Sequence, residues 1–273
     1  MTPSSERWKP VLLAILFLTV LLFVPKLFLA GSPLYTKLIT PQFLHYFGSL
    51  SRIFLLLAAL LYATRSALVF EKGNPVRPAW VFLAAGLFFY FVAQAILGVY
   101  QIGFGTAAPF PSLADPLFLL AMILWFIALA MFIRVYHQAG FLDFGRSESI
   151  RIVLGFGIPL VILAFIVLWP IARMPVPAMN KALNLAYPVS DLLLLIPVGL
   201  LTRVAVRLWG GKVLKVWTLL LAGFVFLAFA DILFAYFDVL DLASVDPLVD
   251  VLYAASYVFL CWGTICQYDL VQS

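Results

Sequence analysis

Residues 12–24 read LLAILFLTVLLFV, and Thr19 is the only polar residue among them. A transmembrane β-strand alternates apolar and polar residues, whereas this run is continuously apolar. A membrane-spanning helix needs about 20 predominantly apolar residues and satisfies its backbone hydrogen bonds internally. The apolar stretch runs from about Val11 to Ala30, which is longer than the apolar part of a signal peptide. It therefore predicts a retained first transmembrane helix.

The whole chain has the composition of a membrane protein. Of its 273 residues, 65% are hydrophobic and 11% are charged, and the mean hydropathy is +1.12. Soluble domains carry about 25% charged residues, so the lipid bilayer is the expected partner and solvent of this surface. The net charge of +5 does not indicate a nucleic-acid partner, because the basic residues stand singly at helix ends. We predict an all-α, polytopic helical bundle that forms one integral membrane domain over residues 1–273.

Further apolar runs are separated by breaks rich in Pro, Gly and charged residues. We expect the segment Gly31–Leu50, which mixes aromatic residues with Pro and His, to form a short helix at the membrane interface. The apolar runs predict eight transmembrane helices, at about 11–30, 52–70, 79–101, 115–136, 151–170, 188–208, 216–237 and 249–267.

The Lys and Arg residues predict the orientation, since they are enriched in cytoplasmic loops. With the N-terminus inside, five of seventeen lie outside, namely Lys26, Lys37, Arg52, Arg173 and Lys181. Both chain ends are then cytoplasmic. The other twelve lie on the cytoplasmic side: Arg7, Lys9, Arg65, Lys72, Arg77, Arg134, Arg146, Arg151, Arg203, Arg207, Lys212 and Lys215.

Every even-numbered predicted span begins, at its outer end, with a charged residue: Arg52, Asp115, Asp191 or Asp250. A proline precedes each of the three aspartates, which suggests a repeated helical hairpin with the aspartates at one depth, within two turns of their helix starts. A simpler explanation also exists, because Pro and Asp both favour the first helical turn. Ser112 followed by Asp115 has the spacing of a capping box.

Two residues do not fit the capping explanation. Asp231 follows an apolar run well inside its predicted span, and an ionisable group at that depth is costly unless it is paired or hydrated. Arg52 would oppose the helix dipole at a helix N-terminus, so it needs an acidic partner. We expect Asp231 to pair with Arg52, and Gln94 is the alternative partner of Asp231.

These residues predict a polar cavity that opens outward and binds a cation, an amine or a proton-linked ligand. The alternative is a polar pair that only holds helices together. We expect Tyr236 and Tyr253 nearby. The predicted ligand-binding residues are Asp231, Arg52, Asp115, Asp191, Gln94, Tyr187, Asp250 and Tyr257.

No enzyme activity is expected, and no catalytic residues, metal site or cofactor are predicted. His45 and His137 fall on opposite sides of the membrane, and Cys261 and Cys266 lack the spacing of a metal or redox pair. No predicted span has a lysine at its centre that could form a Schiff base. Nucleophile and phosphate-loop motifs are likewise missing from the sequence.

Four motifs in this order resemble the multi-pass N-terminal sensor region that precedes diguanylate cyclase, c-di-GMP phosphodiesterase and histidine kinase domains in bacteria. The resemblance implies a sensory module in the bacterial inner membrane, with a cytoplasmic signalling partner or an output domain. Homodimerisation is a further option. The motifs are PSLADPLFLL (111–120), YPVSDLLLL (187–195), ADILFAY (230–236) and DVLYAASY (250–257).

Two other functions remain open. A small proton- or cation-coupled transporter would also need acidic residues inside the membrane. A membrane scaffold subunit would use its apolar and aromatic surface to pack against other proteins. The surroundings of Asp231 distinguish these options, since a scaffold predicts a buried pair and a sensor or carrier predicts a cavity.

Overall fold

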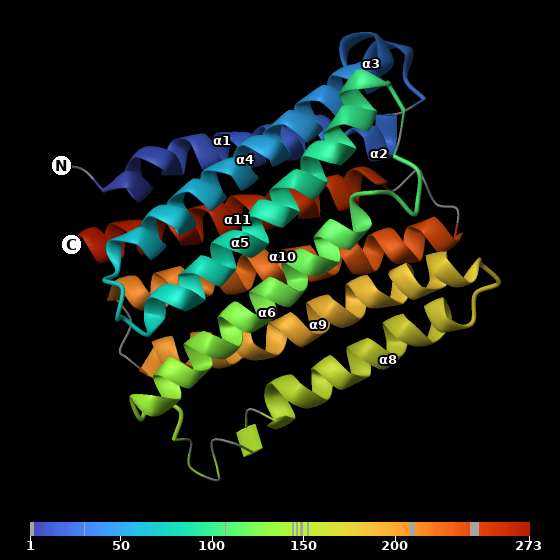
Figure 1. Cartoon of the computed structure of the whole chain (residues 1–273). Coiled ribbons are helices and arrows are strands. Elements are labelled where there is room, and N and C mark those ends of the chain that lie inside the picture. The colour runs from blue at the N-terminus through green and yellow to red at the C-terminus, as the bar shows by residue number, and fades with distance from the viewer. Residues whose placement is uncertain are drawn as a thin grey trace.

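The computed structural model describes residues 3–29, 31–106, 108–143, 145, 147, 150–151, 153–207, 211–240 and 246–273. Within these residues the regular elements are helical. In chain order they are α1 (Ser4–Phe23), α2 (Lys26–Leu29), α3 (Pro33–Leu38), α4 (Pro41–Val69), α5 (Val76–Gly98), the π-helical turn η1 (Val99–Gly103), α6 (Asp115–Gln138), the π-helical turn η2 (Val153–Gly157), α8 (Ile158–Ala172), α9 (Ala178–Arg207), α10 (Gly211–Leu240) and α11 (Asp246–Gln272) (Figure 1).

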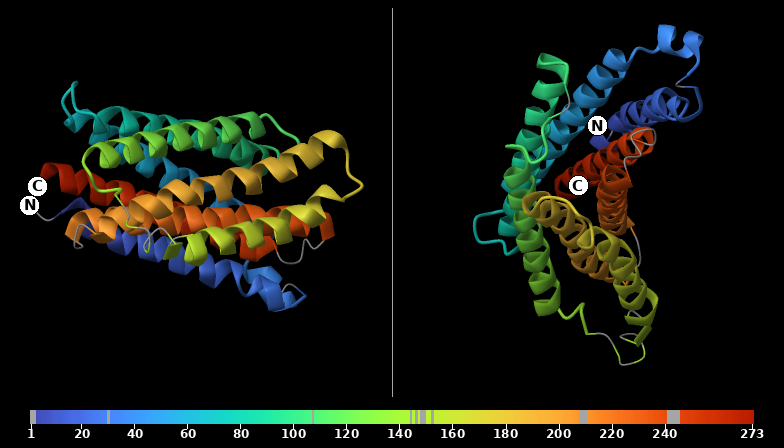
Figure 2. Two further views of the ribbon diagram at one scale, coloured as in Figure 1. Left: turned by 90° about the horizontal axis from the view of Figure 1, so that it is seen from below. Right: turned by 90° about the vertical axis from the view of Figure 1, so that its right-hand side faces the viewer.

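Six of the long helices form a closed ring. Helix α4 packs against α5, α5 against α6, α6 against α9, α9 against α10, α10 against α11, and α11 against α4 again. Helix α1 packs on the outside against α11 and α4, and α8 packs on the outside against α9 and α10 (Figure 2). The ring therefore has an interior to which all six helices can contribute side chains.

The described residues contain seven helices that are long and apolar enough to cross a membrane. They match seven of the eight predicted spans, and the protein is a multi-pass helical membrane protein. The remaining predicted span, 151–170, corresponds to α8, which has only 15 residues and follows η2. An eighth crossing therefore stays a prediction.

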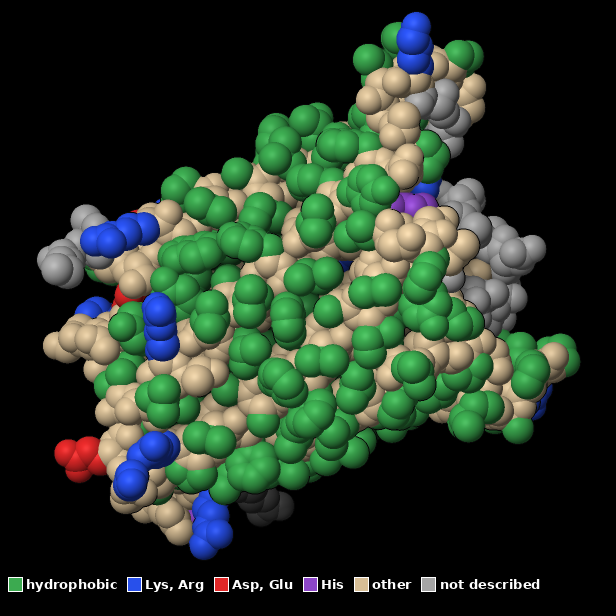
Figure 3. Space-filling view, turned by 45° about the horizontal axis from the view of Figure 1, so that its top comes forward, with side chains coloured by type: hydrophobic (Ala, Val, Ile, Leu, Met, Phe, Trp, Pro, Cys, Tyr) green, Lys and Arg blue, Asp and Glu red, His purple; other side chains and the backbone are tan. Residues whose placement is uncertain are grey.

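Lipid explains the outer surface of this bundle. Many of its large apolar side chains point outward, including Phe17 on α1, Val161 on α8 and Ile123 on α6, which are 65%, 69% and 58% exposed. The face shown in Figure 3 is covered by hydrophobic side chains between the two ends of the bundle. Such a surface would aggregate in water and is stable in hydrocarbon.

Helices α4 and α9 begin eleven and ten residues earlier than predicted. Helix α4 begins at Pro41 instead of residue 52, and the Thr40 side chain caps it by accepting a hydrogen bond from the Phe43 N–H at 3.2 Å. Helix α9 begins at Ala178 instead of residue 188, so Pro188 lies inside it. Only α3 remains of the short interfacial helix predicted within Gly31–Leu50. The polar residues in these early turns, among them Gln42, His45 and Asn184, lower the local hydropathy, so a hydropathy argument places the helix starts too late.

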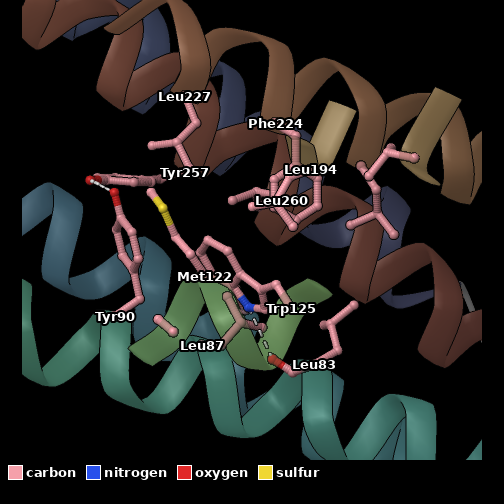
Figure 4. Close-up of a cluster of buried hydrophobic side chains, with 14 of the residues drawn as sticks. Leu83, Leu87, Tyr90, Met122, Trp125, Leu194, Phe224, Leu227, Tyr257 and Leu260 are labelled. Carbon is pink, nitrogen blue, oxygen red and sulfur yellow. Dashed lines mark hydrogen bonds between the residues drawn. The ribbon is translucent and has the colours of Figure 1, made fainter. Parts of the chain in front are cut away.

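A layer of aromatic and aliphatic side chains fills part of the ring (Figure 4). The Trp125 ring stacks on Tyr90 with centroids 5.0 Å apart, and its Nε1 donates to the Leu83 carbonyl at 3.3 Å. Gly86 makes this approach possible, since a Cβ there would lie 2.4 Å from Trp125 Cδ1. Small residues allow close helix approach in membranes, so this layer holds α5 and α6 in register.

Both chain ends lie at the same end of the bundle (Figure 1). The start of α1 is tied there to α11, because the Asp269 carboxylate accepts from the Ser4 N–H at 2.8 Å and the Ser5 N–H at 2.6 Å. On the face shown in Figure 3, Lys and Arg side chains gather mainly at this end. Arg146, which was predicted to be cytoplasmic, lies outside the described residues.

Candidate functional site

A cavity of about 370 Å³ occupies the ring at the end opposite the chain termini. All six ring helices line it, and the exposed residues His45 and Pro109 mark where it opens. Seven of the eight predicted ligand-binding residues lie on its wall, while Asp191 lies behind Asp231. The seven are Arg52, Gln94, Asp115, Tyr187, Asp231, Asp250 and Tyr257.

Arg52 pairs with Asp250 and not, as predicted, with Asp231. Arg52 Nη2 lies 3.0 Å from Asp250 Oδ1, and Arg52 Nε donates to the Gly48 carbonyl at 3.0 Å. Arg52 is the twelfth residue of α4, so it is not at a helix N-terminus. The prediction was wrong because the start of α4 was misplaced and because helix rotation, which the sequence does not display, brings Asp250 to Arg52.

Asp231 faces the cavity from α10 and is only 8% exposed. Its Oδ1 accepts a short hydrogen bond from the Tyr253 hydroxyl on α11. The Asp191 carboxyl on α9 lies within hydrogen-bonding reach on its other side. Asp231 therefore connects the cavity to a second, fully enclosed acidic residue.

Asp115 combines a capping role with a place in the cavity wall. Its Oδ2 accepts from the Ser112 backbone N–H at 2.5 Å and from the Ser112 hydroxyl at 3.1 Å, which is the acidic half of the predicted capping box. Its Oδ1 accepts from the Tyr187 hydroxyl of α9 at 2.5 Å. Asp115 therefore accepts hydrogen bonds from the turn that precedes α6 and also lines the cavity.

The three aspartates do not occupy equivalent positions in their helices. Asp115 is the first residue of α6 and Asp250 the fifth of α11, as predicted, but Asp191 is the fourteenth of α9. The prediction for Asp191 was wrong because Pro188 was taken as a helix start. A proline is tolerated inside a membrane helix when neighbouring groups or water satisfy the backbone carbonyl that it leaves free. The proposed repeat of charged helix starts therefore fails at Arg52 and Asp191.

A second group of polar side chains lies on α5 and the π-helical turn that follows it. The Tyr257 hydroxyl donates to Gln94 Oε1 at 3.3 Å and lies 3.5 Å from the Tyr90 hydroxyl. In η1, the Gln101 side chain accepts a short hydrogen bond from the Ser49 hydroxyl. Single π-helical turns are frequent at functional sites. Gln94 and Gln101 both line the cavity.

Sequence reasoning missed several residues of the wall, among them Asn184, Gln101, Phe118 and Phe234. Asn184 is 2% exposed and precedes Tyr187 by three residues and Asp191 by seven. This spacing places all three on one helix face, which would have identified Asn184 if α9 had been extended upstream. Tyr236, by contrast, is 37% exposed and does not line the cavity.

The charges of the wall are unevenly distributed. Arg52 and Asp250 neutralise each other, which leaves Asp115 and Asp231 as carboxyl groups that tyrosines contact. Lys26 on α2 also lines the cavity. Aromatic rings cover much of the remaining wall: Tyr90, Phe110, Phe118, Tyr187, Phe234, Tyr253 and Tyr257.

No protein-family model, curated protein or solved structure matches this chain. The resemblance to bacterial sensor regions therefore stays a prediction that rests on the four motifs. All four motifs contribute residues to the cavity wall: Asp115 from the first, Tyr187 from the second, Asp231 from the third, and Asp250, Tyr253 and Tyr257 from the fourth.

Proposed function

We propose that this protein is a membrane sensory module that binds a small organic cation in the cavity. The observation that carries the proposal is the set of partners that Asp115 and Asp231 have. Within the described part of the chain, each accepts a tyrosine hydrogen bond at the cavity wall and neither pairs with a cation. A carboxylate in a low-dielectric site attracts a positive charge strongly, so a cationic ligand would supply the missing partner.

The aromatic wall narrows the class of cation. Tyr90 packs edge-on against Phe118 with ring centroids 4.6 Å apart, and Tyr253 stacks on Tyr257 at 6.1 Å. Aromatic faces attract ammonium groups and solvate their alkyl substituents, as in sites for quaternary ammonium ions. The cavity volume falls within the usual range for small-ligand pockets, about 300–1,000 Å³. An amine or quaternary ammonium compound fits this wall better than a bare metal ion.

The signalling half of the proposal rests on topology and on the resembling motifs. The cavity opens at one end of the bundle and the chain ends lie at the other. With the termini in the cytoplasm, a ligand would enter from outside and a cytoplasmic partner or output domain would respond. We place the protein in the bacterial cytoplasmic membrane on this basis, as a protein without enzymatic activity of its own.

Reporter insertions test the orientation. A reporter inserted at Gly73, in the turn between α4 and α5, is expected to be cytoplasmic, and one at Gly105 is expected to be external. The twelve-to-five distribution of basic residues is the physical reason. A cytoplasmic signal at Gly105 would reverse the topology and leave an external ligand without access to the cavity.

Matched cations and neutral isosteres test the ligand class. Choline and its uncharged isostere 3,3-dimethylbutan-1-ol have the same shape, as phenethylamine and 2-phenylethanol nearly do. Isothermal titration calorimetry on the full chain in lipid nanodiscs is expected to show binding of at least one cation, about tenfold or more tighter than its neutral counterpart. Equal affinities within both pairs, or binding of acetate in place of the cations, would contradict the proposal.

A proton- or cation-coupled carrier is the second candidate, and one observation favours it. The Asp191 and Asp231 carboxyl groups lie next to each other inside the bundle, which is an arrangement suited to proton binding. Flux of radiolabelled choline into proteoliposomes separates the candidates. A carrier that exchanges protons for the cation would accumulate the label when the proton concentration is higher inside the proteoliposomes. A sensor would bind the label only in proportion to the amount of protein.

A further inference from the structure

Asp191 and Asp231 form an unusual pair, because both carboxyl groups are enclosed within the membrane bundle. Their side chains come from α9 and α10, which pack against each other, and the residues are 2% and 8% exposed. Each carboxyl lies within hydrogen-bonding reach of the other. Two ionised carboxylates have no proton to share and repel each other at this distance, so the arrangement requires a proton.

The hydrogen bonds indicate which member holds that proton. Asp231 accepts from the Tyr253 hydroxyl, and an O–H donor stabilises a carboxylate. Asp191 Oδ2 is buried and, among the N–H and O–H groups of the described residues, has no donor. An ionised Asp191 would leave this oxygen bare in an apolar environment, which is costly, whereas a neutral acid carries no charge to solvate.

Among the described residues, no cation pairs with either aspartate. The charged and titratable groups around the pair are Tyr253, Tyr257 and Asp250 on α11, Tyr187 on α9, Asp115 on α6, Tyr90 on α5 and Arg52 on α4. Arg52 is bonded to Asp250. Lys26 and His45 are the other basic residues that line the cavity, and neither lies within 4.0 Å of a carboxyl group of the described residues. The pair therefore has no positive charge in contact with it that could replace the proton.

We propose that Asp191 and Asp231 bind one proton at neutral pH, with Asp191 as the neutral acid and Asp231 as the carboxylate, and that a cation bound at Asp231 displaces this proton. The second part rests on the proposed function. When the cation reaches Asp231, its charge stabilises both carboxylates. The Asp191 O–H bond then breaks, and the proton passes by way of Asp231 to the water in the cavity. The proton and the cation thus compete for the pair formed by Asp191 and Asp231.

Infrared difference spectroscopy tests the pair without any ligand. At neutral pH the full chain in nanodiscs is expected to show the C=O stretch of a buried carboxylic acid. Asp191→Asn should remove this band, and Asp231→Asn should shift it, because the acid then loses its carboxylate partner. Asp143→Asn, at an exposed carboxylate near the other end, should leave it unchanged. If Asp191→Asn does not fold, Asp191→Glu retains an acid and should move the band.

Choline then tests the displacement. Its binding is expected to reduce the acid band, to release protons in calorimetry with two buffers of different ionisation enthalpy, and to tighten as pH rises. An acid band that Asp191→Asn leaves intact would overturn the proton site. A band that bound choline does not alter would overturn the displacement alone. Failure of choline and phenethylamine to bind would count against the proposed function, while the ligand-free spectra would still decide the proton site.

Discussion

Asp231→Asn is expected to weaken choline binding by about tenfold to a hundredfold, the largest effect of any single substitution in the cavity. The substitution keeps the shape of the side chain and removes the charge that would attract the cation. Interactions with a charged group contribute about 1.5–3 kcal/mol, which corresponds to that change in the dissociation constant. Binding of the neutral isostere 3,3-dimethylbutan-1-ol should change little, because it depends on the aromatic wall.

The control for this experiment is Asp143→Asn. Asp143 is exposed beyond the end of α6, away from the cavity, so replacing it raises the net charge by the same amount as Asp231→Asn without touching the site. Calorimetry measures the choline affinity of both variants, and melting temperatures confirm that both are folded. The comparison separates the effect of the Asp231 charge from the effect of the net charge of the protein. Similar losses of choline affinity in the two variants would mean that the overall charge of the protein, and not Asp231, attracts the cation.

Arg52→Gln is expected to lower the free energy of unfolding by about 2 kcal/mol, between the values for exposed and buried ion pairs. The side chains of Arg52 and Asp250 are 12% and 28% exposed, so solvent screens their attraction only in part. Removing Arg52 leaves Asp250 without its partner in a wall that already holds Asp115 and Asp231. The guanidinium also ties α4 to α11, so the ring should become less stable at this end.

Thermal melting in detergent measures this effect, and a double-mutant cycle identifies its cause. Asp250→Asn alone should also destabilise the protein, and Arg52→Gln with Asp250→Asn should recover much of the loss, because no charge is then left uncompensated. Lys215→Gln is the control, since its pair with Glu6 spans 4.0 Å between side chains that are 45% and 56% exposed. Additive losses in the double variant would mean that Arg52 acts through packing and not through charge.

The sequence alone predicted the helical membrane class and much of the cavity. Asp231 was identified because no cap or loop could explain a carboxylate after an apolar run, and this argument needs only the local sequence. The same holds for Gln94 and for the motif that contains Tyr187. Polar residues are rare within membrane-spanning segments, so these residues can be recognised from the sequence alone.

Other features depended on information that no local segment contains. Pro188 predicts a helix start in a soluble protein, but α9 passes through it because neighbouring helices enclose that segment. Arg52 and Asp250 are 198 residues apart, and their ion pair exists because α11 closes the ring onto α4. Asp191 was expected at the membrane surface and instead lies beside Asp231, out of direct contact with the cavity.

The sequence by itself determined which segments are apolar enough to span a bilayer and which residues are too polar for lipid, and its basic residues predict an orientation that stays a prediction. These properties depend on consecutive residues and on the thickness of hydrocarbon. Only the tertiary structure decided which polar side chains meet. Partner choice depends on the rotation and axial position of each helix, and these are set by packing such as that of Trp125 against Gly86 and Tyr90. The cavity exists because six helices turn polar residues toward one common interior.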